Sequence, residues 1–458
     1  MKLFYTIYLL FLLCFVDGYS NEIILEEHYK VVNTFSGDID KKDTFHLIIA
    51  KNKKNKKYEI IPVSYFNTNL VRLPSISFKS KPSIISYHSN NDGITLVIST
   101  GGSEPVKKAL GVNLITGKYT LSEKITRYNL KAALRKKDKS LLITNNFSDL
   151  KISQIHSVDS INSFLFKKNK KNSQFFKRVQ NSVFSPVNTD DFVKNGPIST
   201  FKVYYVNDIL CFTRDDFYKK LTSIVRFNFL NGIDDKDVDY KEFIYERFKE
   251  VKEVSTYLYN NKLYQLLLGK KSGFININDI VTGEFKSISL KEVIGSTDLQ
   301  DFLKESTKGK YKSTITVNMS SDGKRIVRCD YVDSTIYGYN YNWWFHHQQF
   351  MWHQQHMMQN VPSFGPSNLS GDFNDNFFNN NDKHYFEIVL DENGGVLKNA
   401  KVNYELKDID KKKHTKSVDD DESIKHVSSV FIDNLFIYFY LDLKANSFKV
   451  SNKSINYD

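Results

Sequence analysis

A weak internal repeat constrains the fold of this chain more than any other feature of its sequence. The segment Gly111–Ile125 (GVNLITGKYTLSEKI) is similar to Asn276–Ile294 (NINDIVTGEFKSISLKEVI), and both contain an apolar residue, Thr, Gly, a charged residue and an aromatic ring in that order. Thr116 and Thr282 hold the same place in the two copies and lie 166 residues apart. A third of that separation is about 55 residues, which predicts a repeated supersecondary unit of that length.

Turn signals recur at the spacing of this unit. Glycine and proline are scarce (20 and 8), and β-branched and aromatic runs alternate with Asn, Asp, Gly and Lys, a pattern typical of short antiparallel strands. Hairpin tips are predicted near Lys54, Gly117, Lys171, Gly232, Gly283, Gly394 and Ser447. A second turn precedes an apolar strand at Asp92-Gly93, Asp138-Lys139, Asn207-Asp208, Asn260-Asn261 and Asp322-Gly323. Two turns per unit predict about four strands per unit, which is the composition of a propeller blade.

The predicted fold is therefore all-β: a seven-bladed β-propeller over residues 21–458, with six or eight blades as alternatives. The last unit is short at its C-terminal end, and an N-terminal strand around Ile23–Val32 is expected to complete it and close the ring. A pair of β-sandwich domains stays open as an alternative, because strand counts do not separate these folds. One connection, Thr297–Glu305, has a capping-box pattern and predicts a helix.

The first 20 residues have the pattern of a signal peptide. Lys2 is followed by the apolar run Leu3–Val16, and Gly18 and Ser20 are small residues at a spacing typical of cleavage sites. This run is shorter than the roughly 20 apolar residues that a membrane-spanning helix needs. The sequence therefore predicts a secreted soluble protein without an integral membrane span, with a formal net charge of +12.

Two cysteines remain after removal of the signal peptide, which carries Cys14. Cys211 and Cys329 fall in equivalent strands two units apart, where a ring would hold their Cα atoms beyond the roughly 7 Å that a disulfide spans. Both are predicted to be buried free thiols.

One insert differs from everything around it. All three tryptophans of the chain lie in Trp343–Met358 (WWFHHQQFMWHQQHMM) together with four histidines, and residues 340–383 as a whole have the composition of a low-complexity, disordered insert. Imidazoles suit zinc, copper or nickel, so His346, His353 and His356 are candidate metal ligands, although no Cys, Asp or Glu accompanies them. An exposed aromatic and Met-rich surface also suits a partner protein, for which the candidates are Trp343, Trp344, Phe350 and Trp352.

The charged segments of the chain predict solvated turns. Basic runs occur at Lys51–Lys57, Arg135–Lys139, Lys167–Lys171 and Lys411–Lys413, and the last belongs to a charged loop at 408–424. Such runs are compatible with binding to an anionic surface. No aromatic side chains are interleaved with them, as nucleic-acid binding requires. The motifs of serine hydrolases, zinc proteases, dithiol enzymes and EF-hands are absent, so neither a catalytic site nor a cofactor is predicted.

The composition has one further consequence. Lys, Asn, Ile and Phe dominate, and the Asn-rich FFNNN stretch (Phe377–Asn381) and the tips KNKKNKK and KKNKKN are typical of malaria-parasite proteins. With a signal peptide and a soluble body, the chain resembles the parasitophorous vacuolar proteins. The host-targeting motif R-x-L-x-E/Q/D is not found after the signal; the closest stretch, Arg72–Ser75, lacks the spacing and the acidic residue.

The resemblance implies a secreted protein of the vacuole lumen that assists protein export. Its partners would be export translocon components and cargo proteins, and its role that of a scaffold or adaptor rather than an enzyme. The alternative is a secreted propeller hydrolase or glycan-binding protein, for which paired carboxylates in the central channel would be the expected sign.

Overall fold

The computed structural model describes most of the chain from Asn21 to Ile455. Its gaps are residues 91–92, 102–104, 147–148, 168–181, 183, 188, 190–191, 193–195, 198, 230–237, 246–247, 249, 307–310, 334–384, 399, 407–413, 416, 419 and 433.

Seven sheets make up nearly all of the described chain, and each uses strands that are consecutive in sequence except the last. Sheet I contains β2 (Tyr29–Asp38), β3 (Thr44–Asn52), β4 (Tyr58–Phe66), β5 (Asn69–Arg72) and β6 (Ile76–Phe78). Sheet II contains β7 (Ser83–Asn90), β8 (Gly93–Thr100), β9 (Val106–Asn113) and β10 (Tyr119–Leu121). Sheet III contains β11 (Asn129–Arg135), β12 (Ser140–Asn145), β13 (Asp149–Ile155) and β14 (Ile161–Lys167).

Sheet IV is the widest of the second half of the chain, with β15 (Ser185–Val187), β16 (Phe201–Val206), β17 (Ile209–Asp216), β18 (Leu221–Asn228) and β19 (Val238–Ile244). Sheet V contains β20 (Val251–Tyr259), β21 (Lys262–Gly269), β22 (Gly273–Asp279) and β23 (Phe285–Ser289). Sheet VI contains β24 (Tyr311–Met319), β25 (Arg325–Asp333) and β26 (Phe386–Leu390). Sheet VII contains β27 (Ile424–Ile432), β28 (Leu435–Asp442), β29 (Ser447–Ser454) and the N-terminal β1 (Glu22–Ile23). All strand pairs within the sheets are antiparallel except β15 with β16.

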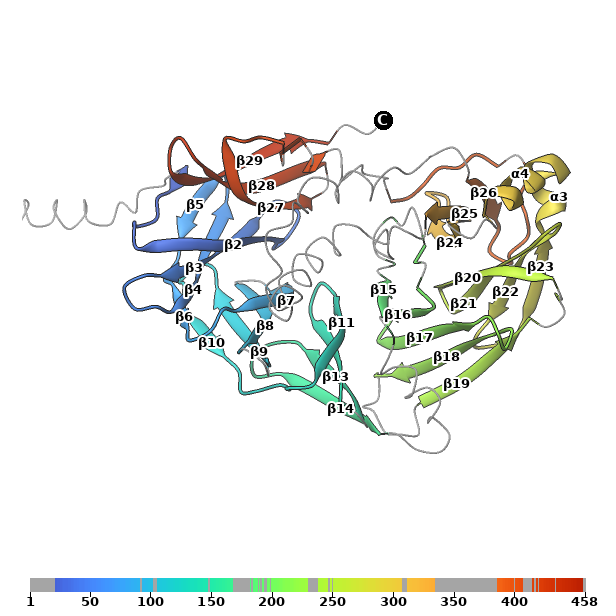
Figure 1. Ribbon diagram of the computed structural model, residues 1–458, viewed down its shortest axis with the longest axis horizontal. Helices are drawn as coiled ribbons and strands as arrows, with labels where there is room; N and C mark the ends of the chain where they lie inside the picture. Colours follow the sequence, from blue (N-terminus) through green and yellow to red (C-terminus); the bar gives the residue numbers. More distant parts are fainter. Residues whose placement is uncertain are drawn as a thin grey trace, which may run out of the picture.

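The seven sheets follow one another around a central axis in chain order, from sheet I in blue to sheet VII in red beside it (Figure 1). Buried apolar clusters fill the spaces between neighbouring sheets from VII through I to VI. Among the described residues, no such cluster joins sheet VI to sheet VII. This arrangement is a β-propeller with seven sheets, so the fold class predicted from the repeat is confirmed and the two-sandwich alternative is wrong.

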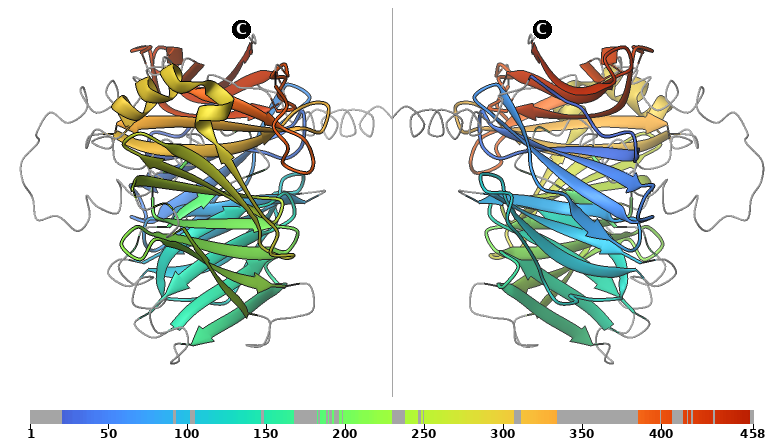
Figure 2. Two further views of the ribbon diagram at one scale, coloured as in Figure 1. Left: turned by 90° about the vertical axis from the view of Figure 1, so that its right-hand side faces the viewer. Right: turned by 90° about the vertical axis from the view of Figure 1, so that its left-hand side faces the viewer.

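Each four-stranded unit has a defined direction. The chain enters the innermost strand at one face of the ring, which we call the entry face, and the first and third turns of each unit lie at the opposite face. The second turn of each unit returns to the entry face, because antiparallel strands alternate in direction. In the side views of Figure 2 the strands run across the molecule between these two faces.

The N-terminal strand closes the ring, although not with the extent predicted. Glu22 and Ile23 of β1 pair with Lys449 and Phe448 of β29, which completes sheet VII. The predicted single strand over Ile23–Val32 is wrong, because a turn in which the Tyr29 N–H donates to the Glu26 carbonyl (2.9 Å) redirects the chain. The residues after that turn form β2, the innermost strand of sheet I.

The turn predictions have a mixed outcome. The five turns predicted to precede an apolar strand, from Asp92-Gly93 to Asp322-Gly323, all lead into the second strand of their units, as predicted. They are the first turns of those units. The predicted hairpin tips do not all fall at the same turn of the unit. Lys54 lies in a second turn and Ser447 directly follows one, while Gly117, Gly283 and Gly394 lie in third turns. Lys171 and Gly232 lie outside the described residues.

Two helices lie on the outer rim beside sheets V and VI (Figures 1 and 2). They are α3 (Leu290–Ile294) and α4 (Ser296–Ser306), and the second confirms the helix predicted at Thr297–Glu305. Leu299, Phe302 and Leu303 of α4 are buried against the core of these sheets. Neither helix is long and apolar enough to cross a membrane, nor is any other helix in the described part of the chain.

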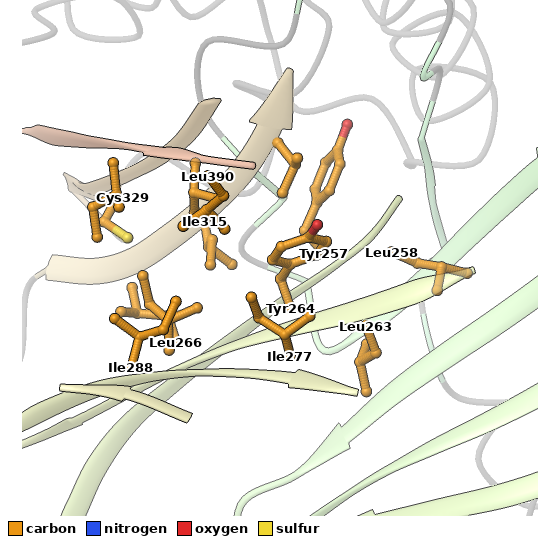
Figure 3. Packing of buried hydrophobic residues seen from close by; sticks show 14 of the residues in the cluster. Tyr257, Leu258, Leu263, Tyr264, Leu266, Ile277, Ile288, Ile315, Cys329 and Leu390 are labelled. Carbon is orange, nitrogen blue, oxygen red and sulfur yellow. The ribbon is translucent and has the colours of Figure 1, made fainter. Parts of the chain in front are cut away.

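The two cysteines are buried and free, as predicted. Figure 3 shows Cys329 beside Ile315 and Leu390 of sheet VI, packed across from Leu266 and Ile288 of sheet V. Burial raises the pKa of the Cys211 thiol to about 12 and that of Cys329 well above its ordinary value. Both thiols are therefore protonated at neutral pH and act as small core side chains.

Candidate functional site

The site residues predicted from the sequence lie outside the described residues. These are the metal candidates His346, His353 and His356 and the partner-binding candidates Trp343, Trp344, Phe350 and Trp352. What the structure does describe is where their segment joins the fold: β25 ends and β26 begins at the entry face, in the place of the second turn of sheet VI. Within the described residues, no group of three His, Cys, Asp or Glu side chains is placed to hold a metal ion.

A half-buried carboxylate, that of Asp38, joins the first three sheets. Arg135 of β11 donates to Asp38 of β2 through both terminal nitrogens (2.8 and 2.7 Å), and the Tyr87 hydroxyl of β7 donates to the same carboxylate (2.6 Å). The Arg135 guanidinium also lies 3.9 Å from the centre of the Tyr87 ring. Burial raises the pKa of Asp38, but the bonds and charge of Arg135 outweigh it and hold that pKa below its ordinary value. Asp38 is thus an ionised anchor between sheets at neutral pH.

A second buried pair joins sheets IV and V. The Lys202 ammonium donates to Asp215 (2.6 Å) and to Thr256 (2.8 Å), and the side chains of the ion pair are 1% and 4% exposed. Thr222 and Thr256 donate to the other lone pairs of Asp215 (3.0 and 2.9 Å). Every polar group of this pair therefore has a partner, which is the condition under which a buried ion pair is tolerated.

Two carboxylates share one cation on sheet VI. Arg328 of β25 contacts Asp330 (3.3 Å) and Glu387 of β26 (3.4 Å), and its guanidinium lies 3.6 Å from the centre of the Tyr385 ring. The Tyr404 hydroxyl donates to Glu387. Because both acids contact the same guanidinium, neither carboxylate is separate from a cation, and the cluster lacks the arrangement of one free acid and one free base that a glycosidase needs.

Two buried histidines hydrogen-bond to serine hydroxyls, the pairing that nucleophilic catalysis uses. His46 contacts Ser36 through Nδ1 (2.8 Å), and His88 contacts Ser140 through Nδ1 (3.2 Å). His46 is 0% exposed and His88 1% exposed, with Ser36 and Ser140 equally enclosed. A serine that no substrate can reach is not a nucleophile, so these pairs serve packing between sheets.

The clearest accessible site is a groove on the outer rim between sheets II and III. Two adjoining cavities of about 600 and 420 Å³ form it, and both are lined by Val158 and Asp159 from the turn between β13 and β14. Tyr119 and Leu121 of β10 line its sheet II side and are 49% and 42% exposed. At Gly111, a Cβ atom would approach the Val158 methyl to 2.9 Å, so glycine permits the close contact at the floor of the groove.

The groove combines apolar and hydrogen-bonding groups. Besides Tyr119, Leu121 and Val158, its lining includes Ile94, Ile125 and Ile161, the polar side chains Asn90, Asn113, Thr120 and Ser163, and the charged side chains Lys118, Glu123, Lys124 and Lys151. Mixed linings of this kind are typical of surfaces that bind polypeptides.

An edge strand borders the same groove. β14 is the outermost strand of sheet III, and among the described strands it pairs only with β13, in seven consecutive residue pairs without a bulge. Its first six residues, Ile161–Phe166, carry no charge and no proline, whereas the edge strand β19 of sheet IV carries Asp239, Lys241 and Glu242. Charges, prolines and bulges are the usual protection of an edge against strand addition, and Ile161–Leu165 of β14 have none of the three.

No protein-family model matches this sequence, and no curated protein matches it either. Similar solved structures include the β-propeller domain of the Trilobed protease from Pyrococcus furiosus, at 11% identity and a TM-score of 0.32, covering 94% of this chain and 98% of that one. The WD40 domain of SCAP from fission yeast is 7% identical with a TM-score of 0.24, covering 58% of this chain and 90% of that one. TolB from Acinetobacter baumannii is 13% identical with a TM-score of 0.22, covering 59% and 56% of the two chains.

The chain is therefore a β-propeller protein on the evidence of its own seven sheets. The likenesses are too distant to add an activity. Among the described residues, the groove between sheets II and III and the β14 edge beside it are open to a partner.

Proposed function

We propose that this chain is a non-enzymatic propeller that binds other proteins, holding an extended polypeptide segment in the groove between sheets II and III. The observation that carries the proposal is the combination of an open, mixed apolar and polar groove with an edge strand along it whose residues Ile161–Leu165 carry no charge, proline or bulge. A segment added antiparallel or parallel to β14 would satisfy the outward backbone groups of that strand, and its alternate side chains would enter the groove.

The state of the buried acids supports a binding role over the hydrolase alternative. The carboxylates described above, buried Asp215 and Asp330 and half-buried Asp38 and Glu387, each lie against an Arg or Lys side chain. A hydrolase needs at least one carboxyl group whose proton or charge is available to substrate.

The proposal extends to location. The N-terminal pattern of a signal peptide supports secretion, and the Lys- and Asn-rich composition supports a parasitophorous vacuole as the compartment. In that compartment an adaptor that holds extended segments would assist the export of unfolded cargo proteins. The support for the location is compositional, and the binding groove is independent of it.

The test is proximity labelling with co-purification from the secreted fraction, comparing the natural chain with Tyr119→Ser. The matched control is Phe285→Ser, because Phe285 holds the same position of the repeat in sheet V, is 52% exposed and lies away from the groove. We expect proteins whose recovery falls with Tyr119→Ser and not with Phe285→Ser. If the two variants recover the same proteins as the natural chain, the groove is not the binding site. If those recovered include no translocon or cargo protein, the export role is wrong.

A further inference from the structure

The two faces of the ring differ in charge, and the difference lies in their turns. At the entry face, four second turns are described in full: residues 53–57, 217–220, 270–272 and 443–446. Between the strands that flank them, these turns contain nine lysines and no acidic residue: Lys53, Lys54, Lys56, Lys57, Lys219, Lys220, Lys270, Lys271 and Lys444. The acids directly beside them are Asp216 and Asp442, the last residues of the preceding strands. All of these lysine side chains are exposed except that of Lys220, which is half-buried.

The turns at the opposite face carry both signs. There, Lys41 and Lys42 lie between Asp40 and Asp43, and Asp138 lies among the lysines of the turn at 136–139. Further acids at this face include Asp159, Asp208, Glu284, Asp322, Asp391 and Glu392. A chain that is rich in lysine throughout would place lysines and acids in the turns of both faces alike, so composition alone does not account for the excess of lysine in the four second turns that are described in full.

The basic turns also present apolar side chains. Tyr218 is 94% exposed and Phe217 42% exposed in the turn of sheet IV, and Leu443 is 42% exposed in the turn of sheet VII. Lysines carry their charge on long flexible stems, and aromatic rings such as Tyr are favoured at the boundary between lipid and water. Lysine and aromatic side chains therefore project together from one face.

The four turns come from sheets I, IV, V and VII and are thus distributed around the ring (Figure 1). A single peptide or one groove would contact one or two of them, whereas a flat surface contacts all at once. We propose that the entry face docks on the surface of a membrane rich in anionic lipids, with the lysines of the second turns at the headgroups and Tyr218 at the interface. Each lysine close to such a surface adds to the attraction, and salt weakens the attraction.

This membrane contact goes beyond the proposed function and uses a different face from the groove. An adaptor held in this way would keep the opposite face and the outer rim open to proteins. The connections into the innermost strands at the entry face carry charges of both signs, such as Glu26 paired with Arg72 (3.0 Å), so the attraction depends on the second turns.

The test is sedimentation with vesicles, using the chain from Asn21 onward, which keeps all seven sheets and lacks the apolar run Leu3–Val16. The probes are vesicles of phosphatidylcholine alone and of phosphatidylcholine with about a third phosphatidylserine. We expect binding only to the second kind, with a partition coefficient that falls as salt is raised.

Two variants that each lose four positive charges show whether vesicle binding depends on the entry face or only on the net charge of the protein. The turn variant replaces Lys53, Lys54, Lys56 and Lys57 by Gln, and the control replaces Lys41, Lys42, Lys118 and Lys137, four exposed lysines of the opposite face, by Gln. We expect the turn variant to lose at least about 100-fold in partition coefficient and the control to lose far less. Tyr218→Ser should weaken binding of the otherwise natural chain.

Three outcomes overturn the proposal: no binding to the anionic vesicles, equal losses in both four-lysine variants, or binding to an acidic polypeptide such as polyglutamate without binding to vesicles. Tyr119→Ser should leave vesicle binding unchanged. An experiment that disproves membrane docking by the entry face therefore leaves polypeptide binding in the groove untouched, and the reverse also holds.

Discussion

His46 should make the ring sensitive to mild acid. Its imidazole is 0% exposed between sheets I and VII, stacks on Phe439 with ring centroids 4.6 Å apart, and contacts Ser36 and Thr44 through its two nitrogens (2.8 and 3.2 Å). Burial lowers the pKa of His46 to about 3 from 6.5. The native protein therefore keeps this side chain neutral where the unfolded chain binds a proton.

The sign and size of the effect follow from that difference. Below pH 6.5 the unfolded state takes up a proton that the native state does not, so the free energy of unfolding falls as the pH falls from 6.5 toward 3. At pH 5 the loss attributable to His46 is about 2 kcal/mol, since each pH unit below 6.5 costs about 1.4 kcal/mol. At pH 7 and above the loss is absent.

The measurement is urea unfolding followed by circular dichroism at pH 7 and pH 5, for the natural chain and for His46→Gln. The amide of Gln keeps hydrogen-bonding capacity but cannot titrate, so we expect the variant to be less stable at pH 7 yet to lose about 2 kcal/mol less on acidification. His28→Gln, at a half-buried position on the rim, is the matched control. If the natural chain and His46→Gln lose the same free energy between the two pH values, the reasoning is refuted.

Three further predictions concern the core. Lys202→Met leaves the Asp215 carboxylate buried without its cation and should lower the free energy of unfolding in urea by about 3–5 kcal/mol. Adding Asp215→Leu to the same chain should restore most of that free energy, and a loss under about 1 kcal/mol for Lys202→Met would contradict the reasoning. Cys211 and Cys329 should resist a thiol reagent at pH 8 until the protein is unfolded, because their thiols are buried and protonated; rapid labelling of the native protein would show otherwise. Ile23→Asp puts a charge into the cluster between sheets VII and I and should lower Tm markedly in calorimetry, whereas an unchanged Tm would mean that β1 contributes little.

The fold was predictable because its turns are encoded locally. Asn207, Asp208, Asn260 and Asn261 all adopt positive φ between 44° and 59°, the backbone of the tightest hairpins, and Asn and Asp tolerate it better than other residues with a side chain. Two such residues before an apolar run therefore identified the turn between the first and second strands of a unit from sequence alone.

The same local chemistry explains why the predicted tips mixed two kinds of turn. The side chain of Asn113 accepts from the N–H of Thr116 (2.7 Å) in a third turn, and that of Asp442 accepts from the N–H of Lys444 (2.9 Å) in a second turn. Because both turns begin with this Asn or Asp bond, sequence spacing could not tell which face of the ring each one occupies.

The candidate site was less predictable, since its parts meet only in the assembled ring. Tyr119 and Val158 line one groove although they belong to different units, and Asp38 meets Arg135 across 97 residues of sequence. No local pattern encodes such contacts. The sequence did contain a signal for the basic entry face, because the run Lys51–Lys57 includes a predicted tip. Only the structure shows at which face of the ring that turn lies.

The pairing of β1 with β29 has a consequence for how the protein is made. Residues 22–23 leave the ribosome more than 400 residues before their partners Phe448 and Lys449, so the joint cannot form until β29 has been made. Sheets I to VI can assemble while the chain grows, yet the ring stays an open arc until β27, β28 and β29 have been made. A chain truncated near its C-terminus would thus leave the apolar side of sheet I uncovered, which gives quality-control chaperones a surface by which to recognise an unfinished molecule.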